Sequence, residues 1–313
     1  MFSRLAAFVL ALALLQQRVA CGEAHFKRFP ATVTSDGAYV LAWGLKDDPA
    51  GDVASKTEIP ADGPEKIDLG ESETADSVED YLVDTTTGKI VATIPEFTYY
   101  AGSEGRENHF NLEVGWSPDN RGGIAIYMAR YATDTIAWIN PTDHKTSNVW
   151  PQIEKAIRQA AIEKKGKSAS DYEISVSNPV FVRPRRLVLG VMVGALSSKR
   201  EDAENYSLDI VFNVKGSLDA PQLEFASAKW ASNDSEEESN ADGEDEEAEL
   251  NRVYHKLANA LSPGDRESLK REQLKWLGTR ERMTAAEKDE KEFNQLELTR
   301  RRIVELKTRA RYR

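Results

Sequence analysis

The sequence contains very little cysteine and histidine, and these shortages exclude several kinds of site. Among its 313 residues, Cys21 is the only cysteine. A single cysteine cannot form a disulfide within the chain, so the fold must be stabilised by its core. The four histidines lie apart, without the spacing of metal ligands: His25, His109, His144 and His255. We therefore expect no metal site.

Motifs of the common catalytic machineries are also absent. The chain has no Gly-x-Ser-x-Gly sequence, no phosphate-binding loop and no dinucleotide fingerprint. Carboxylates are plentiful, but none stands out as an acid–base pair, and a pair formed only by folding is invisible in a sequence. We expect no catalytic residue and no cofactor, and hence a protein that is not an enzyme.

Only the N-terminus carries an apolar run of the kind that directs export. Arg4 is followed by an unbroken apolar run over residues 5–15 and then by small residues. This run has about the length of a signal-peptide core and is too short to span a bilayer. We predict a signal peptide over residues 1–22 and export to the bacterial periplasm or beyond. Lipidation of Cys21 is the alternative that would attach the chain to a membrane, although Arg18 occupies the position where a lipidation motif has leucine.

Positive charge is scarce over most of the chain, whose formal net charge is −11. Residues 231–249 hold ten acidic residues and no basic ones, whereas residues 250–313 hold 17 basic and ten acidic residues. The acidic strip cannot bury apolar surface and repels itself, so we predict a disordered linker over 231–249. An acidic arm for a basic partner, including the chain's own tail, is the alternative. We expect no nucleic-acid partner, because export separates the protein from most nucleic acid and the basic residues alternate with acidic ones.

Strand patterns dominate residues 25–230, which we assign to one β-rich domain. The candidate strands cover residues 39–43, 81–94 (as a hairpin), 110–116, 124–128, 135–139, 172–176, 187–196 and 206–214. The last two predict a long hairpin, and its first strand is apolar on both faces, which indicates a central position. One amphipathic helix is predicted over 151–165, and residues 46–78 indicate a long surface loop.

A weak internal repeat runs through the first strands. TSDG at 34–37 and SPDN at 117–120 each precede a strand, and DTTTGK at 84–89 and NPTDHK at 140–145 each follow one. These turns resemble those of β-propeller repeats, but we find two such units and a propeller needs at least four blades. We therefore expect a small antiparallel sheet or sandwich with propeller-like turns, or ordinary hairpin turns.

The last part of the chain has helical periodicity. Apolar residues recur every three or four positions at Leu250, Val253, Tyr254, Leu257 and Leu261. Ser262 and Pro263 then end one helix and begin another, as N-cap and first helical residue. A further stripe continues in the last segment, and short loops predict a helical hairpin or three-helix unit. The fold class is therefore α+β, with an antiparallel β-rich domain followed by a C-terminal helical domain.

One segment of this tail matches a known family. Residues 250–282, LNRVYHKLANALSPGDRESLKREQLKWLGTRER, resemble the N-terminal domain of the lysozyme inhibitor LprI type, a small helical domain of exported bacterial proteins. The match rests on Leu-Asn-x-x-Tyr ending at Tyr254 and on Gln-x-x-Trp-Leu-x-x-Arg over 273–280, and LTRRR at 298–302 looks like the family's final helix. The family's paired cysteines are missing, with Thr284 near the place of one, so these helices must hold by packing alone.

Four residues of this motif are the candidate site: Tyr254, Gln273, Trp276 and Arg280. In one interpretation Trp276 packs between helices against Tyr254 and Leu257, and forms the core of the domain. In the other, Trp276 and Arg280 form a surface anchor for a partner, because both residue types are frequent in binding hot spots.

Three functions follow from these observations. The resemblance implies a binding protein whose partner is a protein or cell-wall component, such as lysozyme, and which acts by covering a cell-wall hydrolase. Many lysozymes are basic, so we expect the acidic strip or the acidic body to make the contact. The alternative is an envelope scaffold whose basic tail docks on anionic cell-wall or membrane surfaces. The third is a hydrolase, which requires a deep pocket with a close carboxylate or histidine pair.

Overall fold

The computed structural model describes residues 26–45, 78–94, 111–128, 132–166, 172–195, 206–231, 246–281 and 288–312. The predicted signal peptide with Cys21 lies outside these residues, as does most of the predicted linker. The predicted loop over 46–78 also lies outside them, apart from Val78, which begins a strand instead.

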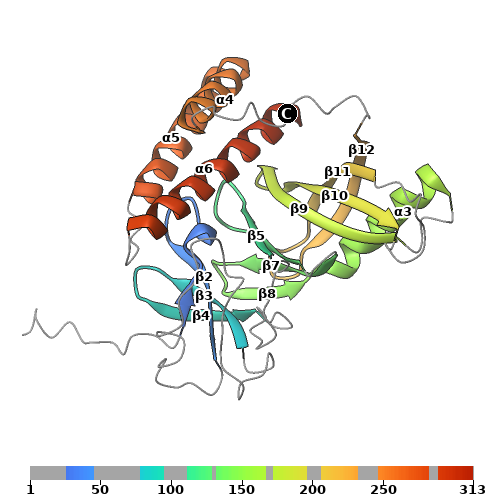
Figure 1. Ribbon diagram of the computed structural model, residues 1–313, viewed down its shortest axis with the longest axis horizontal. Coiled ribbons are helices and arrows are strands. Elements are labelled where there is room, and N and C mark those ends of the chain that lie inside the picture. Colours follow the sequence, from blue (N-terminus) through green and yellow to red (C-terminus); the bar gives the residue numbers. More distant parts are fainter. Residues whose placement is uncertain are drawn as a thin grey trace, which may run out of the picture.

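The described strands form three four-stranded antiparallel sheets, each running up and down in chain order (Figure 1). Sheet 1 consists of β1 (Lys27–Arg28), β2 (Tyr39–Leu45), β3 (Val78–Asp84) and β4 (Lys89–Ile94). Sheet 2 consists of β5 (Asn111–Trp116), β6 (Gly123–Met128), β7 (Thr133–Asn140) and β8 (Lys145–Asn148). Sheet 3 consists of β9 (Tyr172–Arg183), β10 (Arg186–Ala195), β11 (Tyr206–Lys215) and β12 (Gln222–Trp230).

Helices complete the described part of the chain. The short 3-10 helix η1 (Pro30–Thr32) precedes β2, and α3 (Trp150–Lys165) joins sheet 2 to sheet 3. The C-terminal tail forms α4 (Glu246–Ala260), α5 (Pro263–Glu281) and α6 (Lys288–Arg311). Antiparallel sheets followed by C-terminal helices confirm the predicted α+β class.

The strongest sequence patterns gave the right elements. The predicted long hairpin is present as β10 and β11, with Val193 opposite Tyr206, and β10 lies inside its sheet between β9 and β11. Three strands, β1, β8 and β12, were not predicted. All three lie at the edge of a sheet. β1 has only two residues, and β8 and β12 are largely exposed, so none of them shows the apolar alternation that marks a half-buried strand.

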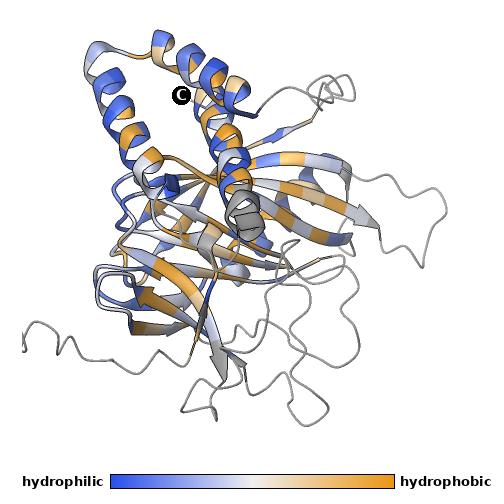
Figure 2. Ribbon diagram, turned by 60° about the vertical axis from the view of Figure 1, so that its left-hand side comes forward, coloured by the Kyte–Doolittle hydropathy of each residue, from blue (hydrophilic) through white to orange (hydrophobic). Residues whose placement is uncertain are grey.

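Sheet 2 is the centre of the β body, because both of its faces are buried. One face packs on sheet 1 through residues such as Tyr127 and Ile139. The other packs on sheet 3 and α3 through residues such as Ile136 and Trp138. Burial on both sides explains why β6 is apolar throughout and why β7 is apolar without alternation over residues 136–139. Figure 2 shows this contrast, since the strands carry broad hydrophobic segments and the tail helices carry alternating bands.

The turns that echo one another in sequence have matching hydrogen bonds. In the turns over 34–39 and 117–122, the first hydroxyl donates to the carboxylate two residues later, over 2.8 and 2.7 Å. The same hydroxyl accepts a bond from the amide five residues later, over 3.0 Å in both turns. The fourth residue has a positive φ in each, at 75° for Gly37 and 54° for Asn120. The internal repeat is therefore structural as well as sequential.

The second pair of turns repeats in the same way. Oδ1 of Asp84 accepts bonds from the amides two and three residues later, over 2.8 and 2.9 Å. Oδ1 of Asn140 does so over 3.1 and 3.2 Å. Sheets 1 and 2 thus share both turns, and the three described sheets are fewer than the four blades of the smallest propellers.

The acidic strip ends earlier than predicted, because α4 already begins at Glu246. Acidic residues in a first turn are stabilised by the positive end of the helix. Glu246 also pairs with Arg300 at 3.0 Å and Glu249 with Lys307 at 2.9 Å, both on α6. The end of the strip therefore binds the chain's own basic tail, one of the two alternatives considered above. No helix in the described part of the chain has the length and apolarity to span a membrane.

The helical tail packs onto the β body rather than extending away from it (Figure 1). Thr279 of α5 donates to the carbonyl of Ser35 over 3.1 Å. Arg309 of α6 donates to the carbonyl of Phe181 over 3.2 Å, and the hydroxyl of Tyr312 donates to Asp209 over 2.6 Å. These bonds join the tail to the first turn of sheet 1 and to β9 and β11 of sheet 3.

Candidate functional site

A cavity of about 260 Å³ lies where the tail meets the β body. We call it the junction cavity. Its walls come from four places that are far apart in the sequence: residues 31–35, residues 113–118, residues 178–181, and the facing sides of α5 and α6. The cavity thus exists only because the tail docks against segments of all three sheets.

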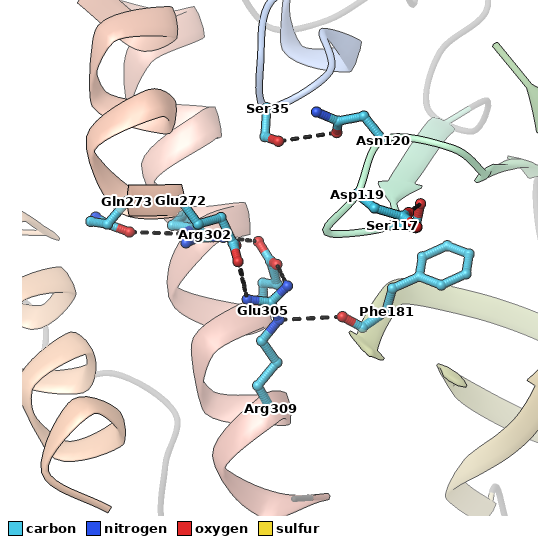
Figure 3. A network of polar contacts seen from close by, with 10 residues as sticks. All are labelled: Ser35, Ser117, Asp119, Asn120, Phe181, Glu272, Gln273, Arg302, Glu305 and Arg309. Atoms are coloured by element: carbon cyan, nitrogen blue, oxygen red, sulfur yellow. Dashed lines mark hydrogen bonds and ion pairs between the residues drawn. The ribbon is translucent and has the colours of Figure 1, made fainter. Parts of the chain in front are cut away.

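One wall of the junction cavity is rigid, because sheets 2 and 3 meet there at van der Waals distance. A Cβ atom added to Gly115 would lie 2.2 Å from the carbonyl oxygen of Pro179, so only glycine allows this approach. Beside it, Ser35 donates to the side-chain oxygen of Asn120 over 3.0 Å and links the repeated turns of sheets 1 and 2 (Figure 3).

The opposite wall holds a buried ion network, which we call the arginine network, made of Arg302, Arg309, Glu272 and Glu305 (Figure 3). Arg302 Nη1 lies 2.8 Å from Glu272 Oε1 and 2.7 Å from Glu305 Oε2. Arg309 Nη1 donates to both oxygens of Glu272, over 2.8 and 2.9 Å, and its Nη2 lies 3.2 Å from Glu305 Oε1. The two positive and two negative charges of the arginine network therefore cancel.

Helical spacing puts these side chains together. Arg302, Glu305 and Arg309 follow one another on α6 at intervals of three and four, which places them on one face. That face is turned to α5, where Glu272 lies next to Gln273, whose Oε1 accepts a bond from Arg302 Nε over 3.0 Å. Five residues from two helices thus form one buried polar cluster.

The network keeps Glu272 and Arg302 charged. Burial alone would raise the pKa of the Glu272 carboxyl, but Arg302 and Arg309 bring that pKa below its ordinary value. Burial alone would lower the pKa of Arg302, but Glu305 and Glu272 raise it further above its ordinary value. Glu272 is therefore an ionised structural partner and not a proton donor near neutral pH.

One donor of the network remains unused. Nη2 of Arg302 is buried and has no hydrogen-bond partner among the described residues. The side chain is only 2% exposed and lines the junction cavity. A buried donor without an acceptor costs about 1–3 kcal/mol, more when it is charged, so this nitrogen marks a place where an acceptor is missing.

Little in the sequence distinguishes Arg302 from the arginines beside it. Arg302 belongs to a run of three arginines, which is typical of an exposed helix face. Successive helical residues point about 100° apart, and the three go to different places. Arg300 pairs with Glu246, Arg301 donates to the carbonyl of Ala31 over 3.4 Å, and Arg302 is buried. The one available signal was the spacing of Arg302, Glu305 and Arg309.

The four residues singled out in the sequence take part in internal contacts. Trp276 is 7% exposed and belongs to the core of the tail with Leu257, while Tyr254 packs at its margin. Arg280 lies over the Trp276 ring at 4.9 Å from its centre and donates to Thr299 over 2.9 Å.

The motif also meets the cavity. Trp276 is one of its lining residues, and Gln273 holds the guanidinium of Arg302. The structure thus brings Gln273, Trp276 and Arg280 together along α5 against α6, whereas Tyr254 lies on α4. Within the described ranges, no group of three or more histidine, cysteine or acidic side chains is arranged to hold a metal ion.

No protein-family model matches this chain, and no curated protein matches it. The resemblance of the tail to the LprI-type domain therefore rests on the motif residues alone.

Proposed function

We propose that this chain is an exported, non-enzymatic binding protein that holds its partner at the junction cavity. The observation that carries this proposal is the buried Arg302 with an unused donor in the wall of a cavity formed by segments of the three sheets and the tail. A partner in contact with this cavity would touch every major part of the molecule. The partner is a protein or a cell-wall component, and the tail motif makes a cell-wall hydrolase such as lysozyme the first one to test.

The state of the carboxylates supports binding over catalysis. Glu272 and Glu305 both lie within hydrogen-bond distance of Arg302, so the cavity does hold a close carboxylate pair. A hydrolase needs one carboxyl of such a pair to carry a proton near neutral pH. The two arginines lower the pKa of Glu272 and occupy its oxygens, which favours a structural role for the pair.

The burial of Trp276 changes how lysozyme inhibition would have to work here. A tryptophan that is 7% exposed and covered by Arg280 offers little surface to a partner. The residues of the acidic strip that lie in α4 already pair with the tail. If the protein covers a hydrolase, we expect the contact at the mouth of the junction cavity and on the acidic β body.

The test is lysis of cell walls by lysozyme with and without the mature protein, at low and physiological salt. Val304 lines the cavity and is half-buried, so Val304→Trp should fill the space and remove inhibition. Leu274→Ala is the matched control, because Leu274 is 60% exposed on α5 and does not line the cavity. Absence of inhibition by the folded protein would remove lysozyme as the partner. Capture from an envelope extract that survives Val304→Trp would contradict the cavity as the binding site.

The scaffold function is the second candidate, and one surface favours it. Lys270, Arg271 and Lys275 are exposed around Leu274 on the outer face of α5. Such a face suits an anionic surface, and binding to it should weaken steeply with salt. Sedimentation with anionic vesicles at about 50 and about 300 mM salt tests it, because the Debye length is much shorter at the higher salt concentration. Binding that does not respond to salt, or no binding, would remove this candidate.

A further inference from the structure

We infer that the junction cavity takes an uncharged amide, namely a backbone carbonyl of a partner peptide together with the apolar side chain next to it. This inference rests on the proposed function, since it names the chemistry of the ligand that the same cavity would bind.

The first step is the unused donor. Arg302 cannot turn its guanidinium freely, because Nε is held by Gln273 and Nη1 by two carboxylates. Its Nη2 therefore has a fixed direction and needs an oxygen acceptor. A carbonyl oxygen that enters the cavity would remove the cost of this buried donor, and part of that gain would appear as affinity.

The second step is charge, which decides between a carbonyl and a carboxylate. The charges beside Nη2 are already balanced: Arg302 and Arg309 share Glu272 and Glu305, both of which lie at Nη1 of Arg302. Arg300, which also lines the cavity, pairs with Glu246. A third carboxylate at Nη2 would approach Glu272 and Glu305 in a water-poor site, where like charges repel strongly. A neutral acceptor makes the same hydrogen bond without that repulsion, so the site favours an amide.

The third step is the rest of the lining. Much of it is aliphatic or prolyl: Ala31, Val114, Pro179, Val180, Leu298 and Val304. Apolar walls of this kind favour an aliphatic side chain. The volume of about 260 Å³ is below the roughly 300–1,000 Å³ of most small-molecule sites. The cavity therefore suits one residue of a longer peptide better than a whole cofactor.

Three small probes test the assignment on the full mature protein. N-acetyl-leucinamide carries a neutral amide and an aliphatic side chain, and N-acetyl-leucine differs from it by one carboxylate. N-acetylglucosamine presents the same acetamido group on a sugar. Binding is followed by NMR titration of the tryptophan indole signals, because Trp116 and Trp276 both line the cavity. We expect the amide to bind about tenfold or more tightly than the acid, since one like-charge contact costs at least about 1.4 kcal/mol.

Two variants separate the donor from the space. Arg302→Lys keeps a positive charge but removes the second nitrogen of the fork, and it should reduce the preference for the amide over the acid. Val304→Trp leaves Arg302 in place but fills the cavity, and it should abolish binding of every probe. Circular dichroism shows whether each variant is folded. If Arg302→Lys does not fold, Val304→Trp and the three probes still decide the question.

Several outcomes would overturn the inference. Equal or tighter binding of N-acetyl-leucine would show that the site prefers an anion, and tighter binding of N-acetylglucosamine would assign it to a sugar. Binding of no probe to the folded protein would refute the amide site. If no probe binds but Val304→Trp still abolishes capture of a partner, the amide site is refuted and the proposed function stands. If the probes bind but Val304→Trp does not affect capture of a partner, the proposed function alone is refuted.

Discussion

The β body and the helical tail each bury a carboxylate, and they do so in opposite ways. In the body, Asp80 on β3 is fully buried between sheets 1 and 2, and no described residue forms an ion pair with it. In the tail, Glu272 is buried but bound by Arg302 and Arg309.

The consequence for proton binding is opposite too. Burial raises the pKa of Asp80 to about 8, and the hydroxyl of Tyr127 offsets only part of that rise. The pKa of Glu272 is lowered despite burial, because two arginines face it. The comparison shows that burial alone makes a carboxyl neutral, whereas burial with matched cations makes it a permanent charge.

The strongest way to break the comparison is to remove one member of the arginine network. Arg302→Leu leaves Glu272 and Glu305 without their shared partner, and we expect the free energy of unfolding to fall by about 3–5 kcal/mol. Urea denaturation followed by circular dichroism measures it. Arg252→Leu is the matched control, since Arg252 pairs with Glu249 but is 58% exposed, and it should cost less than about 1 kcal/mol. Equal losses in both variants would contradict the special role of the buried network.

The two regions also differ in how much space their glycines have. Gly115→Ala in the body would bring a Cβ to 2.2 Å from the Pro179 carbonyl oxygen, and separating the sheets should cost about 3 kcal/mol. In the tail, nothing lies within 4 Å of the same atom at Gly278, which is inside α5. Gly278→Ala should therefore stabilise by about 0.5–1 kcal/mol. Thermal unfolding should show a lower melting temperature for Gly115→Ala and a higher one for Gly278→Ala. A Gly115→Ala protein as stable as the natural chain would show that sheets 2 and 3 can move apart.

A third test sharpens the comparison through pH. Because the pKa of Asp80 is raised in the folded state, the fold holds a proton that the unfolded chain releases. This contribution to stability is complete below about pH 4 and is lost as the pH rises toward about 8. Asp80→Asn cannot ionise, so it should unfold like the natural chain at pH 4 and be more stable by about 5 kcal/mol at pH 9, since each pKa unit corresponds to about 1.4 kcal/mol. Melting temperatures across that range measure it, and parallel profiles would mean that Asp80 is solvated or paired.

Much of the fold was predictable because its central elements carry strong periodic signals. The hairpin of β10 and β11, the helix α3, the apolar stripe of α4 and the start of α5 all follow from apolar spacing or capping residues such as Ser262 and Pro263. Edge strands carry no such signal, because solvent replaces one neighbour and polar residues are tolerated there. This is why the polar β8 and the largely exposed β12 escaped prediction.

The candidate site was predictable only in part. Gln273 and Trp276 were singled out by a motif: Trp276 lines the junction cavity, and Gln273 accepts a bond from Arg302 in its wall. Arg302 and Gly115 were not, because their importance comes from neighbours distant in the sequence. A run of arginines gives no sign that one of them is buried, and a glycine in a strand gives no sign of the carbonyl that faces it.

The docking of the tail has a consequence for the order of folding. The bond from Arg301 to Ala31 closes a loop of 270 residues, and that from Thr279 to Ser35 closes one of 244. Contacts between such distant segments form slowly, since the chain must be confined before they contribute any stability. The sheets are held by pairings between strands that are close in the sequence, so they can form first. The tail then docks onto them last. The junction cavity would then form late in folding. A change in the signals of Trp116 and Trp276, which line it, would report the docking of the tail.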